Sequence, residues 1–155
     1  MAEISHAQKA KDLFESGCNC SQSVITAFAD VLKIDEQTAR KLSIGLGGGV
    51  GRMREVCGAV SGAAVILGSV CGGEKADNKE AAYTSVREFA DEFKAFSGSI
   101  ICRELLGLDE NAQESAKPQE RTQQYYQTRP CSQLVYQAAL IIEKKLLAQS
   151  VDKTF

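Results

Sequence analysis

The chain has 155 residues, enough for one domain whose core needs neither disulfides nor a metal to hold it together. Its 18 Lys and Arg residues are scattered and are balanced by 20 Asp and Glu residues, for a net charge of -2, which argues against nucleic acid and anionic membranes as partners. Residues 1–16 contain no secretory signal, and the apolar run 56–70 is too short for a membrane span. We therefore expect a cytoplasmic protein with no membrane span.

Apolar residues recur with a helical period along the chain, and no stretch alternates with a period of two, which predicts an all-α fold. We expect a single helical domain over residues 1–155, a bundle of about six to seven helices. They are predicted near residues 3–16, 20–33, 35–44, 54–71, 77–97, 99–106 and 130–149, with glycines between most of them. Residues 108–129 are polar and form a long loop or hold a short helix, from which Tyr125 and Tyr126 are expected to cover the core.

Four of the six cysteines fall at predicted helix starts. Asn19 is a good N-cap with Gln22 three residues later, which places Cys20 in the first turn of its helix. The other three are Cys57, in the first turn after the glycine-rich stretch, Cys102, near the third position of a helix capped by Ser99, and Cys131, directly after Pro130. Free N–H groups and the helix dipole favour a thiolate at such positions, so we expect a lowered pKa there.

If these four helix starts converge, Cys20, Cys57, Cys102 and Cys131 form a pocket of thiolates that suits an iron–sulfur cluster or a zinc ion. The reducing cytoplasm disfavours structural disulfides, so metal binding, redox chemistry and simple burial remain the alternatives. Cys18 is a secondary candidate, as a substitute ligand or a resolving thiol. Cys71, near a helix end, is expected to lie in the core.

The glycines around Cys57 have two interpretations. Gly58 and Gly62 leave one helix face nearly bare, which allows close helix packing or the approach of a bulky cofactor. Gly48 and Gly49, in the stretch GLGGGVG, could form a backbone nest for an anion. Arg52 and Arg54 follow this stretch, where a cation would favour a thiolate at Cys57, although they could equally be ordinary surface charges.

Two cofactor classes are excluded by missing motifs. The glycine-rich stretch does not fit G-x-G-x-x-G, follows no strand and lacks the GK[ST] of a phosphate-binding loop, so we expect no nucleotide. No CxxCH motif is present, so we expect no covalently attached c-type haem.

At these residues the chain resembles the C-GCAxxG-C-C family, which is described as redox-active. The resemblance covers roughly residues 10–146, and its elements are FESGCNCSQSV, LGGGVGRMREVCGAVSGAAVILG, FSGSIICRELLG and the cysteine that opens the last helix. In this chain a glycine follows Cys57, whereas the family label writes it before the cysteine. The resemblance implies that the four cysteines of the family are Cys20, Cys57, Cys102 and Cys131.

The helical part of split-Soret cytochromes is similar too, which favours iron–sulfur over zinc. The leading hypothesis is therefore electron transfer through a metal centre at the four thiolates, with an iron–sulfur cluster as the expected centre. The alternatives are a metal-free thiol–disulfide oxidoreductase that uses two of the cysteines, and a zinc-stabilised module without catalysis. Whether the protein is an enzyme stays open; we expect an unidentified redox partner protein and a homodimer.

Overall fold

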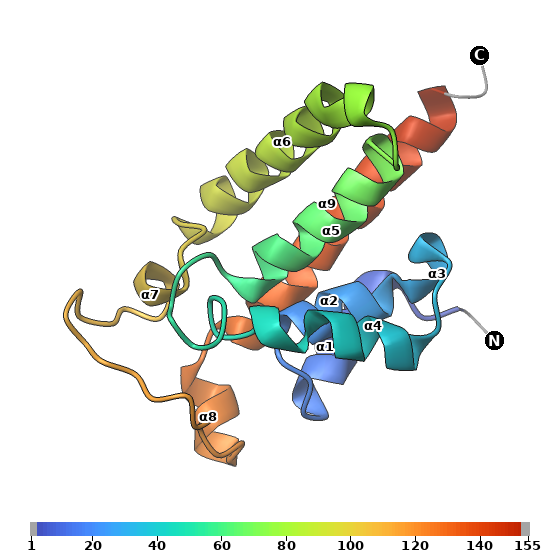
Figure 1. Ribbon diagram of the computed structural model, residues 1–155. Coiled ribbons are helices and arrows are strands. Elements are labelled where there is room, and N and C mark those ends of the chain that lie inside the picture. Colours follow the sequence, from blue (N-terminus) through green and yellow to red (C-terminus); the bar gives the residue numbers. More distant parts are fainter. Residues whose placement is uncertain (1–2, 153–155) are drawn as a thin grey trace.

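The computed structural model describes residues 3–152, and within that range it contains helices and no strand (Figure 1). The prediction of an all-α fold is confirmed. In chain order the elements are α1 (His6–Glu15), α2 (Cys20–Ala27), α3 (Ala29–Leu32), α4 (Glu36–Ser43), the 3-10 helix η1 (Ile44–Leu46), α5 (Gly58–Cys71), the 3-10 helix η2 (Ala76–Asn78), α6 (Lys79–Ser97), α7 (Cys102–Leu105), α8 (Gln123–Thr128) and α9 (Cys131–Asp152).

Residues 3–152 hold nine α-helices, against the six to seven expected. One of the additional helices is α8, in the polar segment whose structure the sequence left open. The other is α3, which arises because the predicted helix 20–33 is interrupted at Phe28. There the backbone N–H bonds to Ile25, three residues back, and the Phe28 ring is fully buried against His6, with ring centroids 4.4 Å apart.

Helix α5 begins later than predicted, at Gly58 instead of residue 54. Arg54 has a positive φ of 62°, which is incompatible with a right-handed helix. The following residues pair with the chain before α7 through an isolated antiparallel bridge between Val56 and Ile101. Residues 54–57 are therefore not helical, at a place where helical periodicity alone predicts a helix.

The three longest helices, α5, α6 and α9, run along one direction and contact one another, while α1, α2 and α4 cross beside them at one end (Figure 1). Helix α1 packs on α9 and on α2, and α2 packs on α5. Their shared core consists of fully buried apolar side chains, among them Phe14, Val24, Phe28, Ala63, Ile66, Leu67, Phe89, Phe93, Val135 and Ile142. This core fixes the helix starts that surround the site described below.

The contact between α2 and α5 depends on glycine. A Cβ atom at Gly62 would lie 3.1 Å from Cβ of Val24, and one at Gly58 would lie 3.0 Å from the backbone nitrogen of Ser21. Both distances are shorter than ordinary van der Waals contact. The two glycines therefore let α5 approach α2 closely, which is the packing role that the sequence allowed for.

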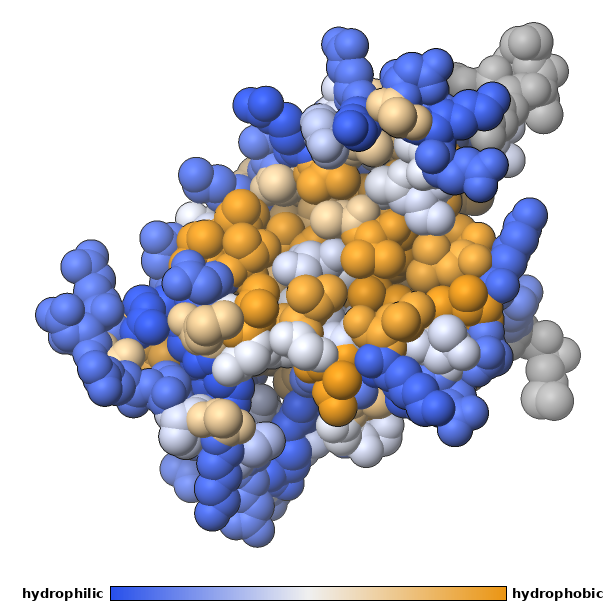
Figure 2. Space-filling view, viewed as in Figure 1, coloured by the Kyte–Doolittle hydropathy of each residue, from blue (hydrophilic) through white to orange (hydrophobic). Residues whose placement is uncertain are grey.

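One face of the molecule is markedly apolar. Figure 2 shows apolar side chains in a band across the middle of the view, where α5 lies in front, with hydrophilic side chains around its edge. Large apolar residues with exposed side chains include Leu42, Ile44, Val65, Tyr83 and Phe96. No helix in the part of the chain that the structure describes has the length and apolar composition needed to cross a membrane.

Candidate functional site

A cavity of about 480 Å³ lies where the starts of α2, α5, α7 and α9 meet. The four cysteines that the sequence singled out all line it: Cys20, Cys57, Cys102 and Cys131. The remaining walls come from the glycine-rich loop, from four arginines and from the segment between α7 and α9. The fold thus brings together four sulfur atoms that are far apart in the sequence.

Each of the four cysteines occupies the first residue of a helix or its N-cap. Asn19 caps α2 through a complete capping box with Gln22, so that Cys20 is the first helical residue. Cys57 is itself the N-cap of α5. Cys102 opens α7, whose N-cap is Ile101, so the prediction of a helix capped by Ser99 with Cys102 near its third position is wrong. Cys131 opens α9, where the carbonyl of Pro130 accepts a hydrogen bond from the N–H of Leu134.

Backbone pairing brings Cys57 and Cys102 to the same place. The N–H of Cys57 donates to the carbonyl of Ile100 at 2.8 Å, and the N–H of Cys102 donates to the carbonyl of Glu55 at 2.6 Å. These bonds flank the bridge between Val56 and Ile101. The two cysteines are therefore positioned by the same short ladder of backbone hydrogen bonds, which joins the residues before α5 to the residues after α6.

The other two cysteines are not among the residues that line the cavity. Cys18 precedes the N-cap of α2, is half-buried, and has a pKa raised by burial. Cys71 ends α5, is half-buried, and accepts a hydrogen bond from Nε2 of Gln149 at 2.9 Å. Cys18, a secondary candidate from the sequence, thus lies beside the cavity wall formed by Gly17, Asn19 and Cys20 and does not contribute to that wall.

The candidate glycines divide into two groups. Gly48, Gly49 and Gly58 line the cavity, whereas Gly62 does not and instead contacts Val24. Gly48 and Gly49 have positive φ angles of 64° and 71°, and a Cβ at either position would collide with the chain at 52–55. Their backbone N–H groups donate no hydrogen bond within residues 3–152, although Gly49 is buried. A buried backbone N–H group without a hydrogen-bond partner, next to the cavity, is suited to bind an anionic ligand.

The four thiols do not share the lowered pKa expected at helix starts. Burial raises the pKa of Cys57 to about 12, even though the N–H groups of Ala59 and Val60 oppose the shift. Burial also raises the pKa of Cys102, against the opposing effect of Arg54. The expectation of a lowered pKa is therefore wrong for these two thiols, because the loss of hydration raises the pKa more than the helix N-terminus lowers it.

Cys20 and Cys131 form an unequal pair. The interaction with Cys131, together with burial, raises the pKa of Cys20 well above its ordinary value, so the expected lowering is wrong for Cys20 as well. The same interaction lowers the pKa of Cys131 to about 7, and the positive charges of Arg129, Arg121 and Arg54 lower it further. Cys131 is thus the thiol that ionises first.

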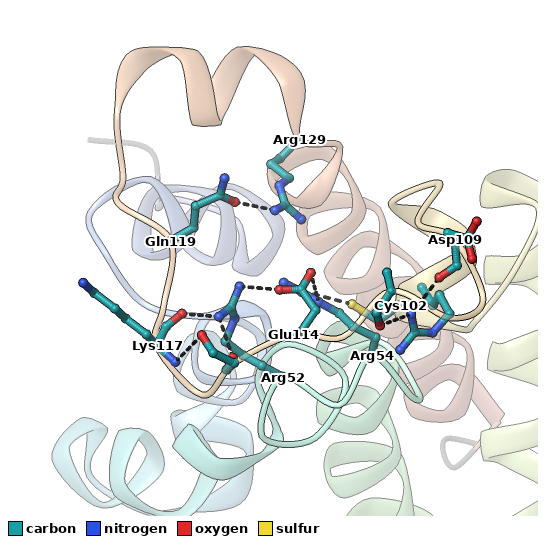
Figure 3. Close-up of polar contacts among 11 residues, drawn as sticks. Arg52, Arg54, Cys102, Asp109, Glu114, Lys117, Gln119 and Arg129 are labelled. Carbon is teal, nitrogen blue, oxygen red and sulfur yellow. Dashed lines mark hydrogen bonds and ion pairs between the residues drawn. The ribbon is translucent and has the colours of Figure 1, made fainter.

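Arginine side chains from two parts of the chain line the cavity, and Figure 3 shows Arg54 next to Cys102. Arg54 is only 6% exposed, and its Nη1 lies 3.6 Å from Sγ of Cys102 while its Nε lies 3.3 Å from Glu114. Arg52, which the sequence placed next to Cys57, instead binds Glu114 at 3.0 Å and the carbonyls of Ser115 and Lys117. Arg54 therefore provides the cation beside a thiol, and that thiol is Cys102.

The same contacts fasten residues 108–122, here called the strap, across the cavity. Glu114 bonds to Arg52 and Arg54, and Arg103 donates to the carbonyls of Asp109 and Ala112. Beyond them Arg121 donates to the carbonyls of Phe14 and Cys18 at 3.0 and 3.1 Å. The strap has no regular structure, so side-chain hydrogen bonds hold it in place.

Among the cavity residues that were not predicted as site residues are Arg121, Tyr125 and Arg129. Their segment is polar and aperiodic, which gave no basis for placing it near the cysteines. Tyr125 was expected to cover the core; it does pack against the core cluster, and it lines the cavity as well.

A comparison with protein families matches residues 18–145 to the family described as "Putative redox-active protein (C_GCAxxG_C_C)". The chain belongs to this family. The resemblance inferred from the cysteine-containing segments is thus confirmed, and membership in the C_GCAxxG_C_C family supports a redox role for the protein. Comparisons with curated proteins and with solved structures each gave no match.

The cavity cysteines are spread around its wall. Within residues 3–152, no three side chains of His, Cys, Asp or Glu come close enough together to hold a single metal ion. A centre bound by all four sulfur atoms would therefore have to span the cavity.

Proposed function

We propose that this member of the C_GCAxxG_C_C family transfers electrons through an iron–sulfur cluster held by Cys20, Cys57, Cys102 and Cys131. The observation that carries the proposal is the convergence of these four thiols, from four separate helix starts, on one cavity of about 480 Å³. Cysteine thiolates are the usual ligands of such clusters.

The residues of the cavity fit this group in three ways. Four soft sulfur donors match the preference of iron–sulfur chemistry. The unpaired N–H groups of Gly48 and Gly49 are donors of the kind that bind cluster sulfurs. Gly58, at the start of α5, leaves the wall next to Cys20 without a side chain.

Positively charged side chains of the protein would stabilise the thiolates that bind the cluster. Ligation requires deprotonated thiols, and the pKa values of Cys57 and Cys102 oppose deprotonation in the metal-free protein. Arg54 lies beside Cys102, and Arg121 and Arg129 act on Cys131, so positive charge is in place for the thiolates that ligation creates. The cluster itself would supply one-electron transfer.

Anaerobic reconstitution with iron and sulfide tests the proposal. We expect visible absorbance, an EPR signal after reduction, and bound iron and sulfide in comparable amounts. Replacing any one of the four cavity cysteines by Ala should reduce the iron content strongly. Cys18→Ala and Cys71→Ala are matched controls that should load normally, because these two side chains do not line the cavity. A wild-type protein that stays colourless and binds no iron would contradict the proposal.

A second candidate function is metal-free thiol–disulfide exchange, and the contact between Cys20 and Cys131 favours it. In this reaction Cys131 attacks a disulfide substrate, Cys20 displaces the mixed disulfide, and the two thiols become one disulfide as the substrate becomes two thiols. After mild treatment with oxidised glutathione, peptide mapping should place a single reversible disulfide between Cys20 and Cys131. Modification distributed over all six cysteines would contradict it.

The remaining expectations from the sequence stay predictions. Metal analysis of protein purified without chelators separates the zinc-stabilised module from the cluster protein. A cytoplasmic location, a redox partner protein and a homodimer have the same standing, and sedimentation velocity measures the oligomeric state directly.

A further inference from the structure

The cavity has the volume of a small-molecule binding site. Its volume of about 480 Å³ lies within the range of roughly 300–1,000 Å³ found for ligand pockets. One part of its wall carries the cysteines and the glycine-rich loop, and another, formed by residues 116–129, carries Arg121, Tyr125 and Arg129. The second part is polar and cationic.

The positive charge of this wall is only partly compensated. Of the four arginines that line the cavity, Arg52 and Arg54 share one carboxylate, Glu114, at 3.0 and 3.3 Å. Arg121 and Arg129 form no ion pair with a carboxylate anywhere in residues 3–152. Their described hydrogen-bond partners are neutral carbonyl, amide and phenol oxygens. The cavity therefore has an excess of positive charge.

Arg121 and Arg129 differ in how much of each guanidinium is free. Arg121 lies over the ring of Phe14 at 4.3 Å and uses both terminal nitrogens in hydrogen bonds to the backbone of α1 and its C-terminal turn. Arg129 lies over the ring of Tyr125 at 5.5 Å and uses one terminal nitrogen, in its bond to Gln119. Arg129 therefore retains donors for a ligand, whereas Arg121 mainly fixes the wall.

A second donor lies on the same wall. The hydroxyl of Tyr125 has no hydrogen-bond partner within the described residues, and Tyr125 lines the cavity between the two arginines, with Arg121 at 4.9 Å from its ring. A guanidinium with free N–H groups and a phenol together match the oxygen atoms of a carboxylate or a phosphate.

We infer that the cavity binds a small molecule carrying a carboxylate or phosphate group, with that group on Arg129 and Tyr125 and the rest of the molecule toward the thiols. Binding of the oxyanion does not require the metal centre. The inference therefore extends the proposed function by naming a ligand class, and the two can fail separately.

Calorimetric titration at constant ionic strength tests the inference, with inorganic phosphate in one arm and succinate in the other. We expect saturable binding in one arm, which identifies the class of oxyanion. Arg129→Gln should weaken it roughly tenfold or more, since a hydrogen bond to a charged group contributes about 1.5–3 kcal/mol. Arg129→Lys should recover only part of the affinity, because lysine lacks the planar fork. Arg87→Gln, on the exposed surface of α6, is the control that should bind like wild type.

A protection experiment on the unmodified protein keeps the inference testable if Arg129→Gln does not fold. The bound oxyanion should slow the reaction of Cys131 with iodoacetamide and leave Cys71, outside the cavity, unaffected. Absence of saturable binding in both arms, undiminished binding by folded Arg129→Gln, or binding without protection of Cys131 would each overturn the inference. Iron content is measured on the same samples, so that failure to load iron is distinguished from failure to bind the anion.

Discussion

At the scale of single residues, the local environment gives chemically identical thiols different acidities. Cys57 and Cys131 both stand at helix starts, yet the pKa of Cys57 is raised to about 12 and that of Cys131 is lowered to about 7. The difference arises because the neighbouring Cys20 thiol and the charges of three arginines lower the pKa of Cys131, whereas burial dominates at Cys57. Helix position alone does not decide which cysteine reacts.

This difference predicts the pH dependence of alkylation in the metal-free protein. A lowered pKa means that Cys131 is protonated below about pH 7 and a thiolate above it, so its reaction with iodoacetamide should rise through pH 7 and then level off. Cys57 should remain slow over this range. Mass spectrometry of labelled peptides, sampled over time at each pH, measures both rates.

The variant Cys20→Ala removes the thiol that contributes most to the lowered pKa of Cys131, so the midpoint of the Cys131 labelling curve should move to higher pH. Cys18→Ala is the matched control, since Cys18 is not among the principal influences on Cys131 and should leave the midpoint unchanged. A midpoint insensitive to Cys20→Ala would show that the arginines alone set the acidity.

At the scale of the elements, two contacts position the site: the close approach of α5 to α2, and the strap over the cavity. The first depends on glycines that leave room for the neighbouring helix. The second depends on arginines that bind the carboxylate of Glu114 and several strap carbonyls. Each can be disturbed separately, and each has an internal control.

Gly62→Ala should destabilise the protein, because the new methyl group would lie 3.1 Å from Cβ of Val24 and would force α2 and α5 apart. Overpacking of this kind costs about 1–3 kcal/mol. Gly68→Ala, in the same helix, has no neighbour within 4 Å and should stabilise by roughly 0.5–1 kcal/mol, because alanine is the better helix former. Urea unfolding followed by circular dichroism measures both, and equal effects of the two substitutions would refute the packing role.

Glu114→Gln should loosen the strap, since it removes the carboxylate that Arg52 and Arg54 share and leaves the buried Arg54 without its ion pair. Limited proteolysis should then cut residues 108–122 faster than in the wild type. Glu110→Gln is the control in the same segment, because Glu110 is exposed and forms no ion pair within residues 3–152. Equal cleavage rates for both variants would mean that Glu114 does not hold the strap.

At the scale of the whole molecule, a metal centre at the cavity would join the starts of four helices distributed from Cys20 to Cys131. Since binding to the folded state stabilises it, anaerobic loading with iron and sulfide should raise the melting temperature. A gain of a few kcal/mol corresponds to roughly 5–10 °C for a chain of this size. Removal of iron by a chelator should reverse the rise, and the increase should be absent in Cys102→Ala.

The sequence predicted the helical class and the starts of α2 and α9 because these depend on local signals, whereas α5 and α7 begin later than predicted, at Gly58 and Cys102. Asn19 with Gln22 marks one start, Pro130 marks another, and glycines mark the ends. The convergence of the cysteines was a hypothesis, since nothing local specifies how helices pack. The non-helical segment 54–57 was missed because the residues with which it pairs, 100–103, are distant in the sequence.

The cationic wall was missed for a similar reason. Arg121 and Arg129 sit in a polar segment without periodicity, and only the folded chain shows that they reach the cavity. The acidity of each thiol also depends on burial and on neighbours from other helices, which the sequence does not reveal.

The ladder between residues 54–57 and 100–103 closes the α5–α6 hairpin at its base, next to the cavity, while the turn around η2 lies at the opposite tip (Figure 1). Glu74 and Lys75 in that turn are exposed. A fluorescent label or an inserted peptide there would lie far from the sulfur atoms, which are positioned at the base of the hairpin. The tip is therefore a natural attachment point for a reporter that follows the protein without perturbing its chemistry.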